Sequence, residues 1–203
     1  MLKQFFQNAK QPRGFWGRSM LSKMNAGHTP LSHWALPQLR LAEDSHVLDI
    51  GCGGGANLLR LLKRCPQGQI DGLDYAAESV RYSRKKVGRA LGEHCRVTQG
   101  DAGQLPYPEQ SFDAVTAFET IYFWPDLPKA LGEIWRVLKP GGQILLVVAA
   151  ADPTDHTWTD MIEGMTIYSE AELTELLNQA NYTQISPQRH ARGWLSLLAT
   201  RPA

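Results

Sequence analysis

The sequence predicts an α/β protein built on a mostly parallel sheet with helices on both faces. From Leu41 onward, short apolar segments alternate with segments of helical periodicity, a pattern typical of parallel sheets. The first apolar segment runs directly into a glycine-rich turn, which is where ligands approach the backbone in such folds. At 203 residues the chain is long enough for one domain with a three-layer core.

The alternation places each element in order. Strands are expected at residues 46–50, 69–74, 96–100, 112–118 and 143–149, and helices at about 56–63, 77–91 and 127–137. Near the C-terminus, Ser169 and Glu172 form a capping box that begins a helix reaching about residue 180, and Asn181 ends it. Two further strands are expected near 183–188 and 194–199.

Composition and charge exclude several classes of protein. Hydrophobic residues at 43%, charged residues at 20% and a net charge of +1 indicate a globular domain that does not attract nucleic acid or an anionic membrane. We find no apolar run long enough to cross a bilayer, and residues 1–10 lack the apolar core of a secretion signal. Cys52, Cys65 and Cys95 are odd in number and irregularly spaced, which argues against disulfides or a metal site and favours a reducing cytoplasm.

The turn after the first expected strand has the features of a nucleoside-binding loop. Gly51, Gly53 and Gly55 let the chain turn sharply and let a ligand approach main-chain atoms. Asp74 ends the next strand, where a carboxylate can accept both hydroxyls of a ribose. Asp49 brings negative charge to the same turn, which would repel a pyrophosphate but attract an amino group or a sulfonium. An adenosine-type cofactor is therefore expected here.

The pattern D-x-G-x-G-x-G, formed by Asp49, Gly51, Gly53 and Gly55, resembles the first motif of the class I S-adenosylmethionine-dependent methyltransferases. The family's later motifs are matched, in order, by residues 97–102, 105–108, 111–115 and 133–142. The nearest large group looks like the methyltransferases related to ubiquinone and menaquinone biosynthesis enzymes. The resemblance implies S-adenosylmethionine as cofactor and a Rossmann-like sheet of seven strands, whose last two form an antiparallel edge hairpin. We expect this domain at 41–203, behind an N-terminal helical cap segment at 1–40.

The resemblance also implies roles for individual residues around the cofactor. The three glycines approach its methionine and ribose portions, Asp49 faces its positive groups, and Asp74 accepts from the ribose hydroxyls. Asp101 accepts from the adenine amine, with the backbone of Ala102 in support. The remaining cofactor contacts are expected from Tyr75, against the adenine face, and from Phe118.

Catalytic residues are expected on the loop after the fourth strand and in the N-terminal segment. Glu119 is interpreted as a base, a partner for a substrate amine, or a contact to the cofactor's amino group. Tyr122 stands where the family often has a histidine, and we expect its hydroxyl to orient a nucleophile or line the pocket. His28, held between Gly27 and Pro30, is the leading base outside that loop.

Aromatic residues outside the core indicate a small, partly apolar or aromatic acceptor. They are expected around the methyl donor, with segments 1–40 and 150–168 as walls or lids, and comprise Phe15, Trp16, Trp34, Tyr122, Phe123, Trp124, Trp158 and Tyr168. The alternative is a non-catalytic accessory or sensor protein that binds S-adenosylmethionine. A nicotinamide-dependent oxidoreductase is disfavoured by Asp49 and the glycine spacing, and a nucleic-acid methyltransferase by the lack of basic excess. Neither the acceptor atom nor the choice between monomer and homodimer follows from the sequence.

Overall fold

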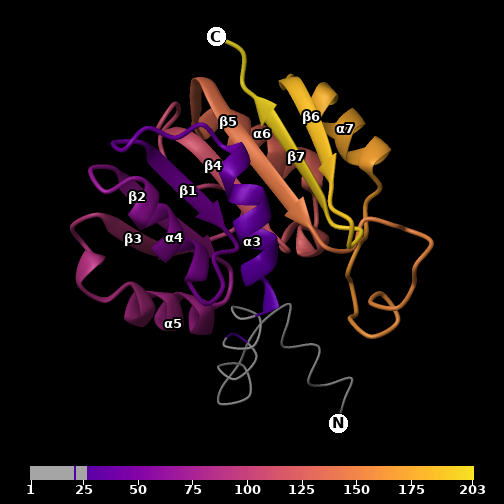
Figure 1. The fold of residues 1–203 in the computed structure, drawn as a ribbon, viewed down its shortest axis with the longest axis horizontal. Coiled ribbons are helices and arrows are strands. Elements are labelled where there is room, and N and C mark those ends of the chain that lie inside the picture. Colours follow the sequence, from indigo (N-terminus) through magenta and orange to yellow (C-terminus); the bar gives the residue numbers. More distant parts are fainter. Residues whose placement is uncertain (1–20, 22–26) are drawn as a thin grey trace.

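The computed structural model describes Leu21 and residues 27–203, which fold around a single twisted sheet (Figure 1). Its seven strands lie in the order β3-β2-β1-β4-β5-β7-β6. The strands are β1 His46–Ile50, β2 Gln69–Asp74, β3 Cys95–Gln99, β4 Phe112–Phe118, β5 Leu138–Val148, β6 Thr183–Arg189 and β7 Leu195–Thr200. The first five strands pair in parallel, whereas β7 is antiparallel to both β5 and β6. The predicted fold class, including its antiparallel edge hairpin, is confirmed.

Helices cover both faces of the sheet. They are α3 Thr29–Ala35, α4 Ala56–Arg64, α5 Ala77–Val87, α6 Leu127–Val137 and α7 Glu170–Gln179, with short 3-10 turns η2 Leu36–Gln38, η3 Gly88–Ala90 and η4 Ile121–Phe123. Buried residues of α3, α4 and α5 share one apolar cluster, and those of α6 and α7 belong to another. The predicted capping box is present at the start of α7, where Ser169 and Glu172 bond reciprocally.

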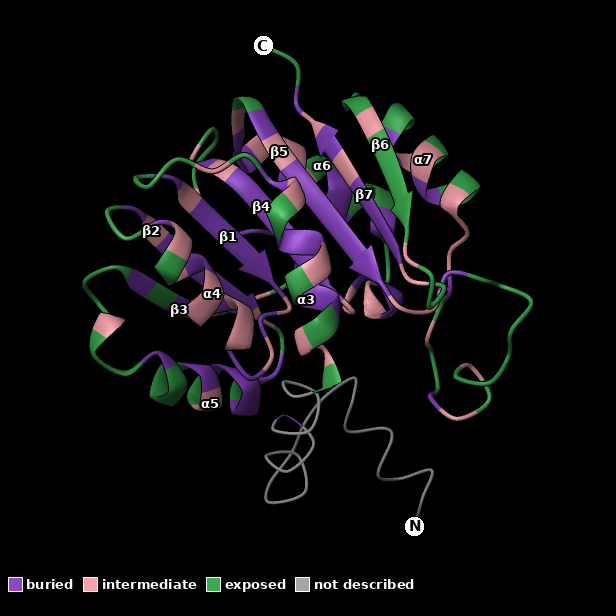
Figure 2. Ribbon diagram, viewed as in Figure 1, coloured by how far each residue is buried: buried purple, intermediate pink, exposed green. Residues whose placement is uncertain are grey.

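Side chains alternate between these two clusters along the central strands, as a sheet buried on both faces requires. Val47 and Leu145 pack toward α3, α4 and α5, whereas their neighbours Leu48 and Leu146 pack toward α6 and α7. Figure 2 shows the resulting purple, fully buried centre of the sheet. Because β1 to β5 are parallel, the residues that follow these strands emerge at the same edge.

Several predicted boundaries differ from the structure. Strand β5 begins at Leu138 instead of residue 143, because Leu138 already pairs with Phe112 before the register shifts around a bulge. Helix α5 ends at Val87 instead of residue 91, because Gly88 adopts a φ of 57° that breaks the helix. Strand β3 lies one residue earlier than expected.

The described part of the expected N-terminal cap is helical, in α3 and η2, and the rest of that segment lies outside the described residues. Trp34 of α3 packs against His190 and Trp194 of the β6–β7 hairpin, with ring centroids 5.4 and 6.2 Å away. These contacts fasten α3 to the sheet. Within the residues described, no helix is long and apolar enough to cross a membrane.

Candidate functional site

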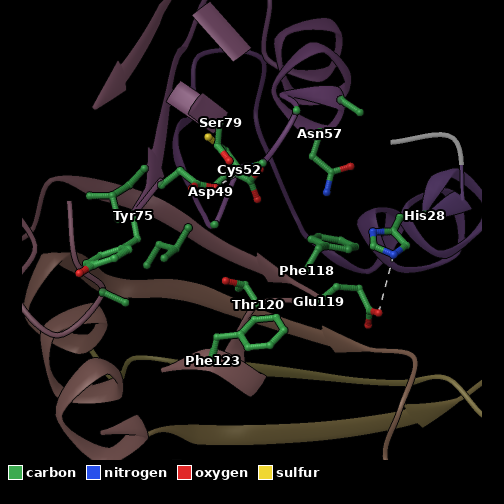
Figure 3. A pocket seen from close by; sticks show the side chains of 18 of the residues that line it. His28, Asp49, Cys52, Asn57, Tyr75, Ser79, Phe118, Glu119, Thr120 and Phe123 are labelled. Atoms are coloured by element: carbon green, nitrogen blue, oxygen red, sulfur yellow. Dashed lines mark hydrogen bonds and ion pairs between the residues drawn. The ribbon is translucent and has the colours of Figure 1, made fainter. Parts of the chain in front are cut away.

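The residues that follow four neighbouring strands meet at one pocket of about 330 Å³. It lies beside the point where the strand order reverses, between β1 and β4, which is the usual ligand position in open α/β sheets. Figure 3 shows Tyr75 at one end of the pocket, and Glu119 and His28 facing each other at the other. The predicted site residues that line it are His28, Asp49, Gly51, Gly53, Asp74, Tyr75, Asp101, Ala102, Phe118 and Glu119.

The glycine turn follows β1 and contacts residues of β2 and of the loop after β4 at the pocket floor. The N–H groups of Gly51 and Cys52 both donate to Leu73 O of β2, at 2.7 and 3.1 Å. Gly51 has a φ of 70°, and a Cβ atom there would lie 2.2 Å from the Thr120 Oγ1 atom beyond β4. Only glycine permits both this conformation and this close approach.

Asp74 is fixed by the same turn. Its Oδ2 atom accepts from the Gly53 N–H at 2.8 Å, and its Oδ1 atom accepts from the Ala76 N–H at 2.9 Å. Burial nevertheless raises the pKa of this carboxyl above its usual value. A carboxylate oxygen has two acceptor positions, so Asp74 retains the capacity to accept from a ligand in the pocket.

Asp49 is a buried carboxyl, with 2% of its surface exposed, between the apolar side chains of Leu48 and Ile50 on β1. Its Oδ1 atom accepts a 2.6 Å hydrogen bond from the Thr116 hydroxyl of β4. Burial raises its pKa to about 7. A positive group bound in the pocket would stabilise the ionised form and so offset this cost.

Glu119 directly follows β4 and has a φ of 57°, a left-handed conformation that is unfavourable for a residue with a side chain. Its Oε1 atom accepts from the Tyr122 hydroxyl at 3.1 Å and from the Ala149 N–H. Its Oε2 atom lies 3.8 Å from His28 Nε2, the contact drawn as a dashed line in Figure 3. Burial raises the pKa of Glu119 to about 7 and lowers the pKa of His28 below its usual value.

Tyr122 does not line the pocket. Its ring is buried, with 3% of its surface exposed, and its hydroxyl accepts a 2.9 Å bond from the Ala150 N–H while donating to Glu119. This tyrosine therefore holds Glu119 in place and contacts the pocket through it.

Gly55 also lies outside the lining, for a different reason. It caps α4 with a φ of 73°, and a Cβ atom there would lie 2.8 Å from the Cβ of Ser83 on α5. A glycine is thus required where α4 packs against α5.

The loops after β2 and β3 form the opposite end of the pocket. Tyr75 is 64% exposed at its rim. Asp101 is exposed as well, and its Oδ1 atom accepts from the Gly103 N–H at 2.7 Å, while Ala102 is buried behind it. Asp101 and Asp74 thus lie on the two strand ends where a nucleoside was expected.

Helix α4 contributes two polar lining residues that sequence reasoning missed, Asn57 and Arg60. They are three residues apart at the start of the helix after the glycine turn, so they share one face, and this spacing was the available signal. Further missed lining residues are Ser32, Cys52, Ser79, Thr120 and Pro125.

Of the expected aromatic wall, Phe123 and Trp124 line the pocket. Trp34 packs instead against the hairpin, and Tyr168 packs against the core cluster of α6 and α7. Trp158 is 41% exposed in the linker 150–168, and no residue of this linker lines the pocket. The expectation that this linker covers the site is therefore not met. Phe15 and Trp16 lie outside the described residues.

Comparison with known proteins finds a match between residues 48–146 and the family described as a methyltransferase domain. A demethylmenaquinone methyltransferase of Deinococcus radiodurans is 41% identical over 101 residues, which cover 50% of this chain and 42% of that protein. One from Listeria welshimeri is 32% identical over 127 residues, covering 62% and 53%. The chain thus spans about half the length of these curated relatives.

Solved structures share the fold over nearly the whole chain. One belongs to a complex between the Haloferax volcanii Trm112 methyltransferase activator and a methyltransferase, with a TM-score of 0.82, 25% identity, and coverage of 91% of this chain and 95% of that chain. Another is a SAM-dependent methyltransferase from Aquifex aeolicus, with a TM-score of 0.76, 22% identity and coverage of 90% and 97%.

Proposed function

Because the chain belongs to the class I S-adenosylmethionine-dependent methyltransferases, with S-adenosylmethionine as its cofactor, we propose that it methylates a small, partly apolar or aromatic molecule by in-line transfer. The observation that carries the proposal is the convergence of four carboxyl side chains on one pocket. They lie at or just beyond the C-terminal ends of four adjacent parallel strands and are Asp101, Asp74, Asp49 and Glu119.

The residues around the pocket fit this cofactor. Asp74 and Asp101 would take its ribose and adenine, and Asp49 would face its positive groups. The turn also leaves room, since a Cβ atom on Gly53 would meet no described protein atom within 3.8 Å. When bound, S-adenosylmethionine supplies a methyl group on a sulfonium, so an acceptor lone pair can bond to that carbon while the carbon–sulfur electron pair stays on sulfur.

Glu119 is proposed as the base that takes the acceptor's proton. Its Oε1 atom is engaged by Tyr122 and Ala149, which leaves Oε2 as the atom that receives the proton. His28 Nε2 lies 3.8 Å from Oε2, but burial lowers the pKa of this imidazole, so Glu119 is the stronger base of the two. A base whose pKa is about 7 combines adequate basicity with ionisation at neutral pH.

The acceptor class is inferred from the lining next to this pair. Phe118, Phe123 and Trp124 give the acceptor end an apolar, aromatic wall. The curated relatives named above are demethylmenaquinone methyltransferases. We infer an acceptor that combines an apolar ring or chain with one nucleophilic atom carrying a removable proton.

Isothermal titration with S-adenosylmethionine and S-adenosylhomocysteine, followed by an acceptor screen that detects released S-adenosylhomocysteine, tests the proposal. We expect both ligands to bind and phenols, quinols or amines to be methylated. Glu119→Gln should lower turnover by roughly 10²–10⁴-fold while changing cofactor affinity far less. Binding without transfer to any acceptor would favour the accessory or sensor function, and methylation of nucleic acid or peptides alone would refute the acceptor class.

Partners and location remain predictions of the same proposal. The chain is expected to act as a monomer or homodimer in the cytoplasm, without a nucleic-acid or membrane partner. The three cysteines, Cys52, Cys65 and Cys95, are free and buried, which agrees with a reducing compartment.

A further inference from the structure

Arg60 is the permanently charged cation among the described residues that line the pocket, where it faces an excess of carboxyl groups. It extends from α4 and is half-buried. One terminal nitrogen donates to Asn57 Oδ1 at 3.2 Å and the other to Thr29 Oγ1 of α3 at 2.8 Å. Guanidinium carries five N–H donors, so these bonds leave donors for a ligand.

Arg60 is half-buried, and no carboxylate among the described residues forms a hydrogen bond with its guanidinium. Here the described partners of Arg60 are an amide and a hydroxyl, both neutral. Asp49 is close enough for the two charges to influence each other, yet its Oδ1 atom accepts from Thr116. The pocket lining therefore includes both a cation and a carboxyl, the two groups that complement the carboxylate and ammonium of an α-amino acid.

The position of Arg60 agrees with this chemistry. Asp101 and Asp74 occupy the end of the pocket formed by β3 and β2, whereas Arg60 and Asn57 lie on α4 beyond the turn of β1. Figure 3 shows Asn57 extending into the pocket on the side of His28, away from Tyr75. A ligand with its adenosine at Tyr75 would thus place its amino-acid end near α4.

We propose that Arg60 binds the carboxylate of the cofactor's methionine portion, and that the same guanidinium, through Thr29, holds the start of α3 and the adjacent His28 against the pocket. This inference rests on the proposed function, since it requires S-adenosylmethionine at the site. Arg60 is then a specificity-determining residue that distinguishes the complete cofactor from analogues without the carboxylate.

The test compares S-adenosylmethionine with decarboxylated S-adenosylmethionine, which differs by that one group, on the full chain by isothermal titration. The wild-type protein should bind the complete cofactor roughly ten- to a hundredfold more tightly, the range for hydrogen bonds between charged groups. Arg60→Gln should bind the two ligands alike, because the loss falls on the carboxylate-bearing ligand alone. Lys63→Gln, an exposed change on the same helix, should keep the full preference.

Two further variants cover the case in which Arg60→Gln fails to fold. Arg60→Lys keeps the charge but loses the planar fork, and should retain part of the preference. Thr29→Val removes the bond to α3 and should leave the preference intact. An unchanged preference in Arg60→Gln or Arg60→Lys, or no preference in the wild-type protein, would overturn the assignment of Arg60. Failure of the wild-type protein to bind either ligand would instead refute the proposed function.

Discussion

The hydroxyl of Tyr122 donates a 3.1 Å hydrogen bond to Oε1 of Glu119 while accepting a 2.9 Å bond from the Ala150 N–H. Tyr122 lies on η4, directly after the loop that carries Glu119, and Ala150 follows β5, so the hydroxyl bridges the ends of two adjacent strands. This bridge helps to hold Glu119 in its left-handed conformation at the pocket.

Removal of this hydroxyl in Tyr122→Phe should shift the acidic limb of the pH–rate profile to higher pH. The hydrogen bond favours the ionised carboxylate, so its loss raises the pKa of Glu119 further above about 7. Unfolding free energy should also fall by about 1–3 kcal/mol, because the Ala150 N–H loses its acceptor. A pH series of kcat/KM and thermal denaturation test both effects. An unshifted limb would show that Glu119 does not govern the reaction.

Glu119→Gln should stabilise the protein above neutral pH and have little effect near pH 5. The pKa of Glu119 rises from 4.5 unfolded to about 7 folded, so the folded state holds the proton more tightly. Ionisation of Glu119 therefore lowers the free energy of unfolding. This loss is absent below the unfolded pKa, grows as the pH rises toward about 7, and reaches its full value of about 3 kcal/mol above that pH. Urea denaturation at about pH 5 and about pH 8.5 measures the difference. If the difference in stability between Glu119→Gln and the wild-type protein is the same at both pH values, Glu119 ionises freely in the folded protein.

Asp74→Ala should weaken the binding of S-adenosylhomocysteine by about 1.5–3 kcal/mol, since a ribose would lose its charged acceptor. The same change leaves the N–H groups of Gly53 and Ala76 without their acceptor, so the turn should loosen as well. Asp74→Asn keeps one acceptor oxygen and serves as the matched variant, with an intermediate loss. Calorimetry on both variants checks the order, and wild-type affinity in Asp74→Ala would place the ribose elsewhere.

The sheet could be predicted because its signals are local. Apolar strands, the capping box of Ser169 and the motifs along the chain each specify one element, and parallel strands then bring their ends together. The boundary of β5 could not be predicted, because Lys139-Pro140-Gly141-Gly142 looks like a turn. In the structure this stretch bulges from the strand, with Lys139 Nζ 2.7 Å from the carboxylate of Asp113.

In the candidate site, too, the residues with local sequence signals could be predicted, and those fixed by long-range contacts could not. Asp49, Asp74 and Asp101 lie at or just after the ends of expected strands, so the sequence predicts that they meet, and all three line the pocket. Gly55 was expected at the cofactor from its motif, and Tyr122 at the reaction site from its position after the fourth strand. Packing against Ser83 and the bond to Ala150 keep both outside the lining. Such contacts join distant segments, and neither spacing nor periodicity indicates them.

Asp49 should release protons when the cofactor binds. Its pKa is about 7 when no cation is bound, because burial outweighs the bond from Thr116. A bound ammonium or sulfonium favours the ionised form and lowers this pKa, so S-adenosylmethionine binding at about pH 6.5 should release a fraction of a proton. Titrations in buffers of different ionisation enthalpy measure this release.

Two variants show whether the released proton comes from Asp49 or from Glu119, the other carboxyl whose pKa is about 7. Asp49→Asn should abolish the release attributed to this site and weaken binding, because the amide cannot carry the charge that the cation requires. Glu119→Gln should retain that release, although the pKa of Glu119 is also about 7. If the proton disappears in Glu119→Gln and persists in Asp49→Asn, the positive portion of the cofactor lies beside Glu119, and the assignment of Asp49 is wrong.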